Sequence, residues 1–355
     1  MTIYWAVGGL AWLMAWLSDA YVRTTHVRRG HESRWSLFDL GAIGVLVAFS
    51  ALRLDVGTDF RAYLAHYVLK INPDSLSATL AQTDHELGFT MVEFVTRRLF
   101  DSPYAIFWTT AALTVVPAYV AIKRLSTRPH FSVALYILLG YYTLPMNIVR
   151  QGVAVSLVFL AYSFVRKSMA VSVLLVAVAG TMHTSAFIMG ALVLILAWRA
   201  PSLRTTSVAL IVAAVVGSAF VQLGWVAEIA GRLSLRYEDY LQLNDAGVGT
   251  RLTIVFRVAL LLYLAAVGAG RADADAKRLL VIAALGTILL FFGTANAAIT
   301  RLDTYFGIFL VVAIPNVLRS IGSRWPVYMG VVVMASVYFV FDLSYFGGLL
   351  PYQTQ

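Results

Sequence analysis

The sequence predicts an all-α, polytopic membrane protein with about 12 transmembrane helices. Of its 355 residues, 60% are hydrophobic and only 13% are charged, whereas soluble domains are about half apolar and a quarter charged. The apolar residues also fall into runs of roughly 17–22, which at 1.5 Å per residue reach across about 30 Å of hydrocarbon. Too little polar surface remains to face water on every side.

Twelve apolar runs give the predicted spans: 2–22, 36–53, 104–122, 131–148, 151–165, 168–182, 184–199, 205–223, 251–269, 279–296, 300–318 and 326–345. No repeat or linker separates two domains, so we expect a single integral membrane domain over 1–355. Two connections are long, 54–103 and 224–250. The remaining connections are short.

The distribution of basic residues predicts the orientation. No Lys or Arg precedes the first apolar run, and a basic cluster that starts at Arg23 follows it. This pattern favours an uncleaved first span with its N-terminus outside. Every loop that the map then places inside is basic, as at Lys123, Arg124 and Arg199. We expect a multi-pass inner (plasma) membrane protein with both termini in the periplasm.

Composition also excludes several kinds of chemistry. The chain has no cysteine, which excludes disulfides, cysteine-ligated zinc and thiol catalysis. The net charge of +9 is accounted for by basic cytoplasmic loops, so we expect no nucleic acid partner. No two histidines stand at a spacing typical of metal ligands, and no glycine-rich phosphate loop is present. We therefore expect no metal and no cofactor.

The long loop 54–103 is amphipathic. Thr58 is a candidate helix N-cap, and apolar residues recur at helical spacing over 60–71. A second short helix is predicted after Gly88, over 89–99, before Pro103. Each run is too short to cross a membrane, so interfacial or re-entrant helices are expected on the periplasmic side.

Arginines near the outer ends of the spans predict an anion-binding site. Guanidinium groups match phosphate bidentately and stay charged. We expect Arg150 and Arg301 to contribute most, with Arg53 and Arg236 as further members. The alternative is that Arg53 pairs with Asp55, that Arg301 pairs with Asp303, or that the side chains reach lipid headgroups.

Three ionisable groups are candidates for a general base toward a hydroxyl. Asp59 is favoured, followed by Glu86 and then His183. The carboxylates have an alternative role as counter-ions, and Asp59 also has one as a helix cap. His183 has an alternative role as a hydrogen-bonded residue of a turn. Tyr63 either stacks on a sugar face or seats its helix in the headgroup region.

Five short motifs, taken in order, resemble the EpsG family of polysaccharide polymerases, which are relatives of the Wzy O-antigen polymerases. They are Arg53-Leu-Asp-Val-Gly-Thr-Asp-Phe-Arg-Ala-Tyr63, Glu86-Leu-Gly-Phe89, Arg150-Gln-Gly-Val-Ala154, His183-Thr-Ser-Ala186 and Arg301-Leu-Asp-Thr-Tyr305. Phe60 departs from the usual Tyr, and Met182 stands where Phe is common. The resemblance to the family is specific because the motifs occur in the family's order, over most of the chain.

The resemblance implies a glycosyltransferase of the hexosyltransferase type that acts on undecaprenyl-diphosphate-linked glycans, as both donor and acceptor, in an O-antigen or exopolysaccharide pathway. The growing chain would move from its lipid carrier to the non-reducing end of the next lipid-linked unit, at the periplasmic face. Gln151 and Tyr305 lie in the matched motifs and join the arginines and Tyr63 as expected binding residues. A chain-length regulator and a flippase are implied partners, beside membrane lipid.

Three alternatives stay open from sequence. A flippase or transporter of lipid-linked oligosaccharide predicts charges deep in the spans and broken helices, and Arg257 is the residue that favours it. An O-antigen ligase would use the same lipid donor with a different acceptor. A scaffold protein would explain the many spans but not the outer arginines.

Overall fold

The computed structural model describes residues 1–29, 35–223, 247–293, 297–345 and 347–355. Helices account for nearly all the regular structure of these residues, and one isolated β-bridge joins Arg53 to Thr354. The predicted all-α class is therefore confirmed. The chain divides into two compact units, 1–191 with 339–355 and 192–338, which are described separately.

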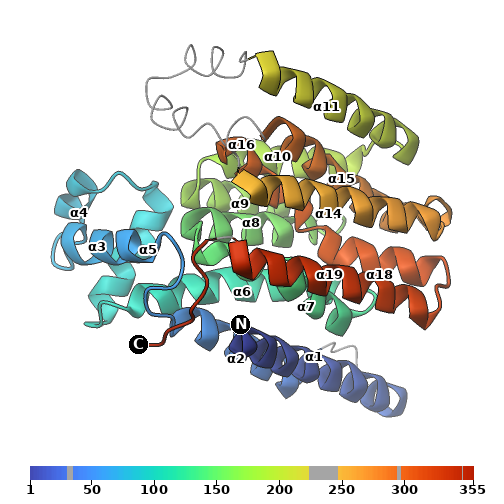
Figure 1. Cartoon of the computed structure of the whole chain (residues 1–355). Coiled ribbons are helices and arrows are strands. Elements are labelled where there is room, and N and C mark those ends of the chain that lie inside the picture. The colour runs from blue at the N-terminus through green and yellow to red at the C-terminus, as the bar shows by residue number, and fades with distance from the viewer. Residues whose placement is uncertain (30–34, 224–246, 294–296, 346) are drawn as a thin grey trace. The chain divides into compact units, whose positions relative to one another are not determined.

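The first unit contains a helical bundle and a group of short helices (Figure 1). Within the bundle α8 packs against α6 and α9, and α2 packs against α1 and α6. Its elements are α1 (Thr2–Arg29), α2 (Leu37–Ala51), α3 (Phe60–Lys70), α4 (Leu76–Gln82), α5 (Leu87–Leu99), α6 (Ala105–Leu125), α7 (Pro129–Leu138), η1 (Leu144–Met146), α8 (Val149–Tyr162), α9 (Met169–Met182) and the start of α10 (Ser185–Trp198).

The two predicted short helices of loop 54–103 are present as α3 and α5. A third, α4, was not predicted and lies between them in the chain, and the three are here called the loop helices (Figure 1). Phe60 and Tyr67 on α3 and Ile71, its C-cap, form a buried cluster with Phe107 of α6, so the apolar spacing indicated the packed face correctly. The predicted cap was wrong by one residue. Asp59, not Thr58, is the N-cap of α3, and its side chain makes no capping hydrogen bond.

The predicted span 131–148 was wrong in its second half. Helix α7 ends at Leu138, and a turn and η1 lead into α8. Gly140 has a φ of +77°, which side chains with a Cβ rarely adopt. Its α-carbon lies against Asp342, so that a Cβ would sit 3.0 Å from Oδ2. The chain therefore reverses here, where hydropathy alone predicted a continuous helix.

The second unit is built around α15, which packs against α11, α14, α16, α17 and α18. Its elements are α11 (Leu203–Leu223), α14 (Gly247–Ala266), η3 (Ala269–Arg271), α15 (Ala274–Gly293), α16 (Ala297–Leu302), α17 (Thr304–Gly307), α18 (Leu310–Ser320) and most of α19 (Trp325–Tyr345). The predicted span 300–318 is thus divided among three short helices. The predicted loop 224–250 lies outside the described residues, apart from its last four positions.

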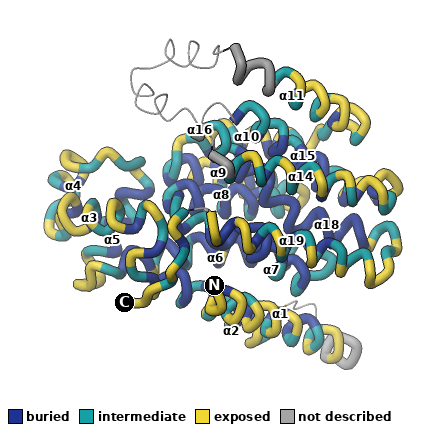
Figure 2. The backbone as a smooth tube through the Cα atoms, viewed as in Figure 1, coloured by how far each residue is buried: buried dark blue, intermediate teal, exposed yellow. Residues whose placement is uncertain are grey.

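Length and hydropathy support a multi-pass membrane protein. Among the described residues five segments are long and apolar enough to cross a membrane: Ala105–Leu125, Gly249–Ala266, Ala274–Gly293, Ile299–Ser320 and Trp325–Tyr345. Six shorter apolar helices accompany them. Side chains such as Leu174, Ile188 and Val333 are more than half exposed, as expected on lipid-facing surfaces. Figure 2 shows many exposed positions along α1 and α11 and a buried α8.

Candidate functional site

Four sequence-predicted residues meet at one end of α8. Glu86 is the N-cap of α5, and Arg150 lies in the first turn of α8. His183 is the C-cap of α9, and Tyr63 comes from α3. All four belong to the first unit. The segments are separated by up to 120 residues (183 − 63), so their convergence is a property of the tertiary fold.

Glu86 is the centre of this group. One carboxylate oxygen, Oε1, lies 2.8 Å from His183 Nδ1 and accepts hydrogen bonds from Thr184 N and Oγ1 at 3.2 and 3.1 Å. The other, Oε2, accepts a 2.6 Å bond from Arg150 Nη1. Burial alone would raise the pKa of Glu86, but the His183 hydrogen bond and the Arg150 charge hold it well below its usual range. Glu86 is therefore a carboxylate at neutral pH.

Arg150 is shared between Glu86 and Tyr63. Its Nε donates to the Tyr63 hydroxyl at 3.2 Å. A guanidinium has five N–H donors, and these two side-chain bonds use two of them. Burial raises the pKa of Tyr63 while Arg150 lowers it, and the net effect is a raised pKa. Tyr63 therefore keeps its phenolic proton because of burial, while its oxygen accepts a hydrogen bond from Arg150.

A glycine allows the close approach that forms the site. The first turn of α5 lies against the end of α9, and a Cβ on Gly88 would be 2.2 Å from Thr181 Oγ1. No real Cβ contact is that short, so α5 packs this closely on α9 only because position 88 has no side chain. This contact brings together Glu86 at the start of α5 and His183 at the end of α9.

Asp59 lies one helical turn before Tyr63, whose backbone N–H donates to the Asp59 carbonyl oxygen. Thr58 Oγ1 donates to Asp59 Oδ1 at 3.2 Å, and the Thr58 backbone N–H donates to Asn147 Oδ1 at 2.7 Å. Asn147 thus ties the start of α3 to the segment before α8. Sequence reasoning missed Asn147 and Thr184, although both lie within three residues of a predicted site residue.

Two ion pairs differ from the pairings that sequence offered. Asp55 pairs with Arg61, not with Arg53. The guanidinium of Arg53 is buried, 4.8 Å from the centroid of the Phe107 ring, and donates to Ser50. In the second unit, Asp303 pairs with Arg257 at 2.9 Å, not with Arg301. Arg257 is therefore neutralised within its own unit.

The remaining predicted residues fall in three places. Gln151 is buried beside Arg150 on α8. Arg301 lies on α16 and the buried Tyr305 on α17, both in the second unit. Arg236 lies outside the described residues. Asp59, Arg53, Gln151, Arg236, Arg301 and Tyr305 stay predicted site residues.

The fold and the site define a class of protein: a multi-pass helical membrane protein with an arginine–glutamate–histidine cluster at the end of one helix. The chain belongs to the EpsG family, which matches residues 37–354. This family is associated with exopolysaccharide biosynthesis. Comparison with curated proteins and with solved structures gave no match. The resemblance read from the five motifs is thereby confirmed at the level of the family.

Proposed function

We propose that this chain joins undecaprenyl-diphosphate-linked oligosaccharide units into a surface polysaccharide, by glycosyl transfer at the periplasmic face of the inner membrane. The convergence of Arg150, Glu86 and His183 carries the proposal. Arg150 is a cation that can bind a diphosphate, and the His183–Glu86 pair can accept the proton of a hydroxyl group. Family membership supports the pathway.

In the proposed reaction the acceptor hydroxyl oxygen attacks the anomeric carbon of the lipid-linked donor glycan. The bond between that carbon and the diphosphate oxygen breaks, and the lipid diphosphate leaves with the bonding electrons. Arg150 offers its remaining N–H donors to the charge that develops on the leaving group. Tyr63, whose oxygen accepts from Arg150, donates its phenolic O–H in a hydrogen bond to the same group.

We assign the acceptor proton to His183, although the sequence favoured Asp59. Glu86 is ionised, so the His183 Nδ1–H donates to it, and in the neutral ring Nε2 is then an acceptor. This is the arrangement by which a carboxylate orients a catalytic histidine in hydrolases. Glu86 itself is a weak proton acceptor because of its lowered pKa. Asp59 stays an alternative base.

The first experiment is deletion of the gene in its host, followed by gel analysis of surface polysaccharide and measurement of lipid-linked intermediates. A polymerase predicts that long chains disappear while single units persist or accumulate on the lipid. Long chains that build up on the lipid carrier would instead identify a ligase. An unchanged pattern of both products would refute either transferase.

The second experiment tests the site in the complemented strain. Arg150→Ala should abolish long chains while the protein still inserts at normal levels. Arg98→Ala is the matched control, because Arg98 forms an exposed pair with Asp74 on the loop helices. Near-normal chain length in the Arg150 variant would remove this residue from the site.

A further inference from the structure

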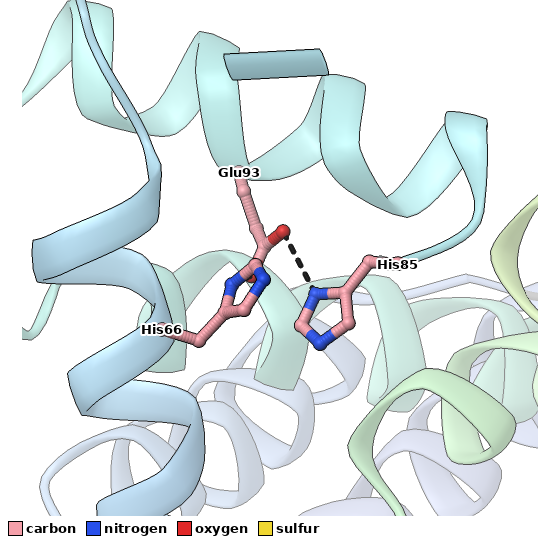
Figure 3. A group of neighbouring side chains, drawn as sticks. All are labelled: His66, His85 and Glu93. Carbon is pink, nitrogen blue, oxygen red and sulfur yellow. Dashed lines mark hydrogen bonds and ion pairs between the residues drawn. The ribbon is translucent and has the colours of Figure 1, made fainter. Parts of the chain in front are cut away.

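A second cluster of ionisable groups lies within the loop helices. His66 is on α3, His85 directly precedes α5, and Glu93 is on α5. Figure 3 shows both imidazoles beside the Glu93 carboxylate. His66 Nδ1 lies 3.2 Å from Glu93 Oε1, and His85 Nδ1 lies 3.0 Å from Oε2. The Glu93 side chain is 0% exposed.

The donor set and its dimensions fit a tetrahedral metal ion. Zinc binds imidazole nitrogen and carboxylate oxygen at about 2.0–2.2 Å, which places neighbouring donors about 3.4 Å apart in a tetrahedron. The two N–O distances, one to each oxygen of Glu93, lie within about 0.4 Å of that edge, and one donor atom from each residue lies within 4.8 Å of the others. The two imidazole rings are stacked, with centroids 3.6 Å apart and planes at 23°, so the rings must rotate for both Nδ1 atoms and the carboxylate to bind one ion.

The surroundings of His66 support the same interpretation. Its second ring nitrogen, Nε2, lies 3.1 Å from Thr83 Oγ1 and 3.7 Å from Asp84 Oδ1. A metal-bound histidine commonly donates its other N–H to such a group, which fixes the ring and its tautomer. Binding of an ion would release the proton from Nδ1 and keep a proton on Nε2, where Thr83 accepts it.

We propose that His66, His85 and Glu93 bind one divalent transition-metal ion of the zinc type, which clamps α3 to α5. The Glu93 carboxylate is fully buried with two imidazoles as its partners, and a divalent cation would add positive charge to this buried anion. The ion would also restrict the movement of the neighbouring site around Arg150. Glu86 follows His85 directly, and the Tyr63 ring lies 5.7 Å from that of His85.

The test uses the full-length protein in detergent, stripped with a chelator and dialysed against Zn²⁺. Elemental analysis should find one zinc per chain, and titration calorimetry should give micromolar or tighter binding. His66→Ala and His85→Ala should each weaken binding by about 100-fold or more, and Thr83→Ala by about 10-fold. His130→Ala is the control, because His130 bonds to Asp19 away from the cluster.

Co²⁺ gives a second readout that needs no variant. The wild-type protein should develop the intense visible bands of tetrahedral cobalt with two nitrogen ligands, and Zn²⁺ should displace them. Absence of stoichiometric zinc, pale octahedral cobalt spectra, or equal binding by wild-type protein and a His66→Ala/His85→Ala double variant would each overturn the proposal. None of these readouts depends on polysaccharide synthesis, so the two proposals fail separately.

Discussion

At the residue scale, Glu86 joins two groups that have different chemical tasks. One of its oxygens orients His183 and the other holds Arg150. The carboxylate is partly buried, and charge-assisted hydrogen bonds in such an environment are roughly twice as strong as neutral ones. Glu86 therefore sets the position of both side chains at once, and removing its charge should disturb both.

Glu86→Gln should lower the turnover of lipid-linked units by at least about 100-fold, since general acid–base catalysis contributes about 10²–10⁴-fold. The amide keeps the size of the side chain but loses the negative charge that holds Arg150 and the His183 tautomer. Turnover is measured with purified protein and lipid-linked donor and acceptor.

Asp74→Asn is the matched control, because Asp74 is an exposed carboxylate on the same loop that pairs with Arg98. Its turnover should match that of the wild type. If Glu86→Gln retained more than a tenth of the wild-type turnover, the orienting role of the carboxylate would be untenable.

Sequence identified Glu86, Arg150, His183 and Tyr63 as separate candidates, but it did not show which of them meet. Charge and position near a span end are local properties, whereas an ion pair depends on how distant segments pack. Asp55 illustrates the limit. Its φ of +53° turns the chain, and its carboxylate pairs with Arg61 although Arg53 is closer in sequence.

At the scale of elements, the contact between α5 and α9 decides the geometry of the site. Gly88→Ala should reduce turnover strongly, because the new Cβ would meet the Thr181 side chain at 2.2 Å and push α5 away. In an exposed helix the same substitution would stabilise by about 1 kcal/mol through helix propensity. A loss of turnover can therefore be attributed to the altered α5–α9 contact. Turnover and insertion are measured together.

A second variant makes this interpretation specific. Thr181→Gly removes the nearest obstructing atoms and leaves the flexible end of Met182, 2.7 Å from the new Cβ. The Gly88→Ala/Thr181→Gly double variant should therefore recover part of the lost turnover. Gly44→Ala is the control, because a Cβ at position 44 meets no atom within 4 Å. Equal losses for Gly88→Ala and Gly44→Ala would show that the α5–α9 contact has no special role.

Helices with long apolar runs were predicted well, since burial in lipid and burial in protein favour the same residues. The runs 36–53 and 104–122 correspond to α2 and α6 within a few residues. The run 131–148 failed because hydropathy carries no information about backbone direction. The positive φ of Gly140 lets the chain reverse inside an apolar stretch, and Thr143 beside it donates a hydrogen bond to Asp342.

At the scale of the whole molecule, one buried charge network joins four helices of the first unit. Lys123 of α6 lies 3.0 Å from Asp39 of α2 and 3.7 Å from Asp19 of α1. His130 of α7 bonds to Asp19 at 2.7 Å, and Tyr119 of α6 donates to Asp39 at 2.8 Å. Sequence assigned Lys123 to a basic loop, but its side chain is 4% exposed.

Lys123→Met should lower the free energy of unfolding by about 3–5 kcal/mol, because it leaves buried carboxylates without their cation. The Asp39→Asn/Lys123→Met double variant should be less destabilised than the single one. Unfolding in detergent is followed by circular dichroism, with the exposed Lys167→Met as control. A single variant as stable as the control would contradict the role of the network.

The class of the protein was predictable because composition alone reveals a membrane protein, and the family was predictable because its motifs occur in order. The cluster of His66, His85 and Glu93 was not predictable. Its members are 19 and 8 residues apart (85 − 66 and 93 − 85), and no regular spacing connects two helices and a turn. Only the packing of α3 on α5 brings their donor atoms together.

The helices α8, α9 and α10 are short, with 14 residues each. At 1.5 Å per residue each reaches about 21 Å, roughly 9 Å less than the hydrocarbon thickness of a typical bilayer. The bilayer would become locally thinner to match the short apolar surface, which includes exposed side chains such as Leu174 and Ile188. We expect the bilayer to thin beside α9 and α10, where the turn at His183 between them lies close to Arg150 of the buried α8. An anionic lipid headgroup would then reach Arg150 by lateral diffusion, without leaving the headgroup layer.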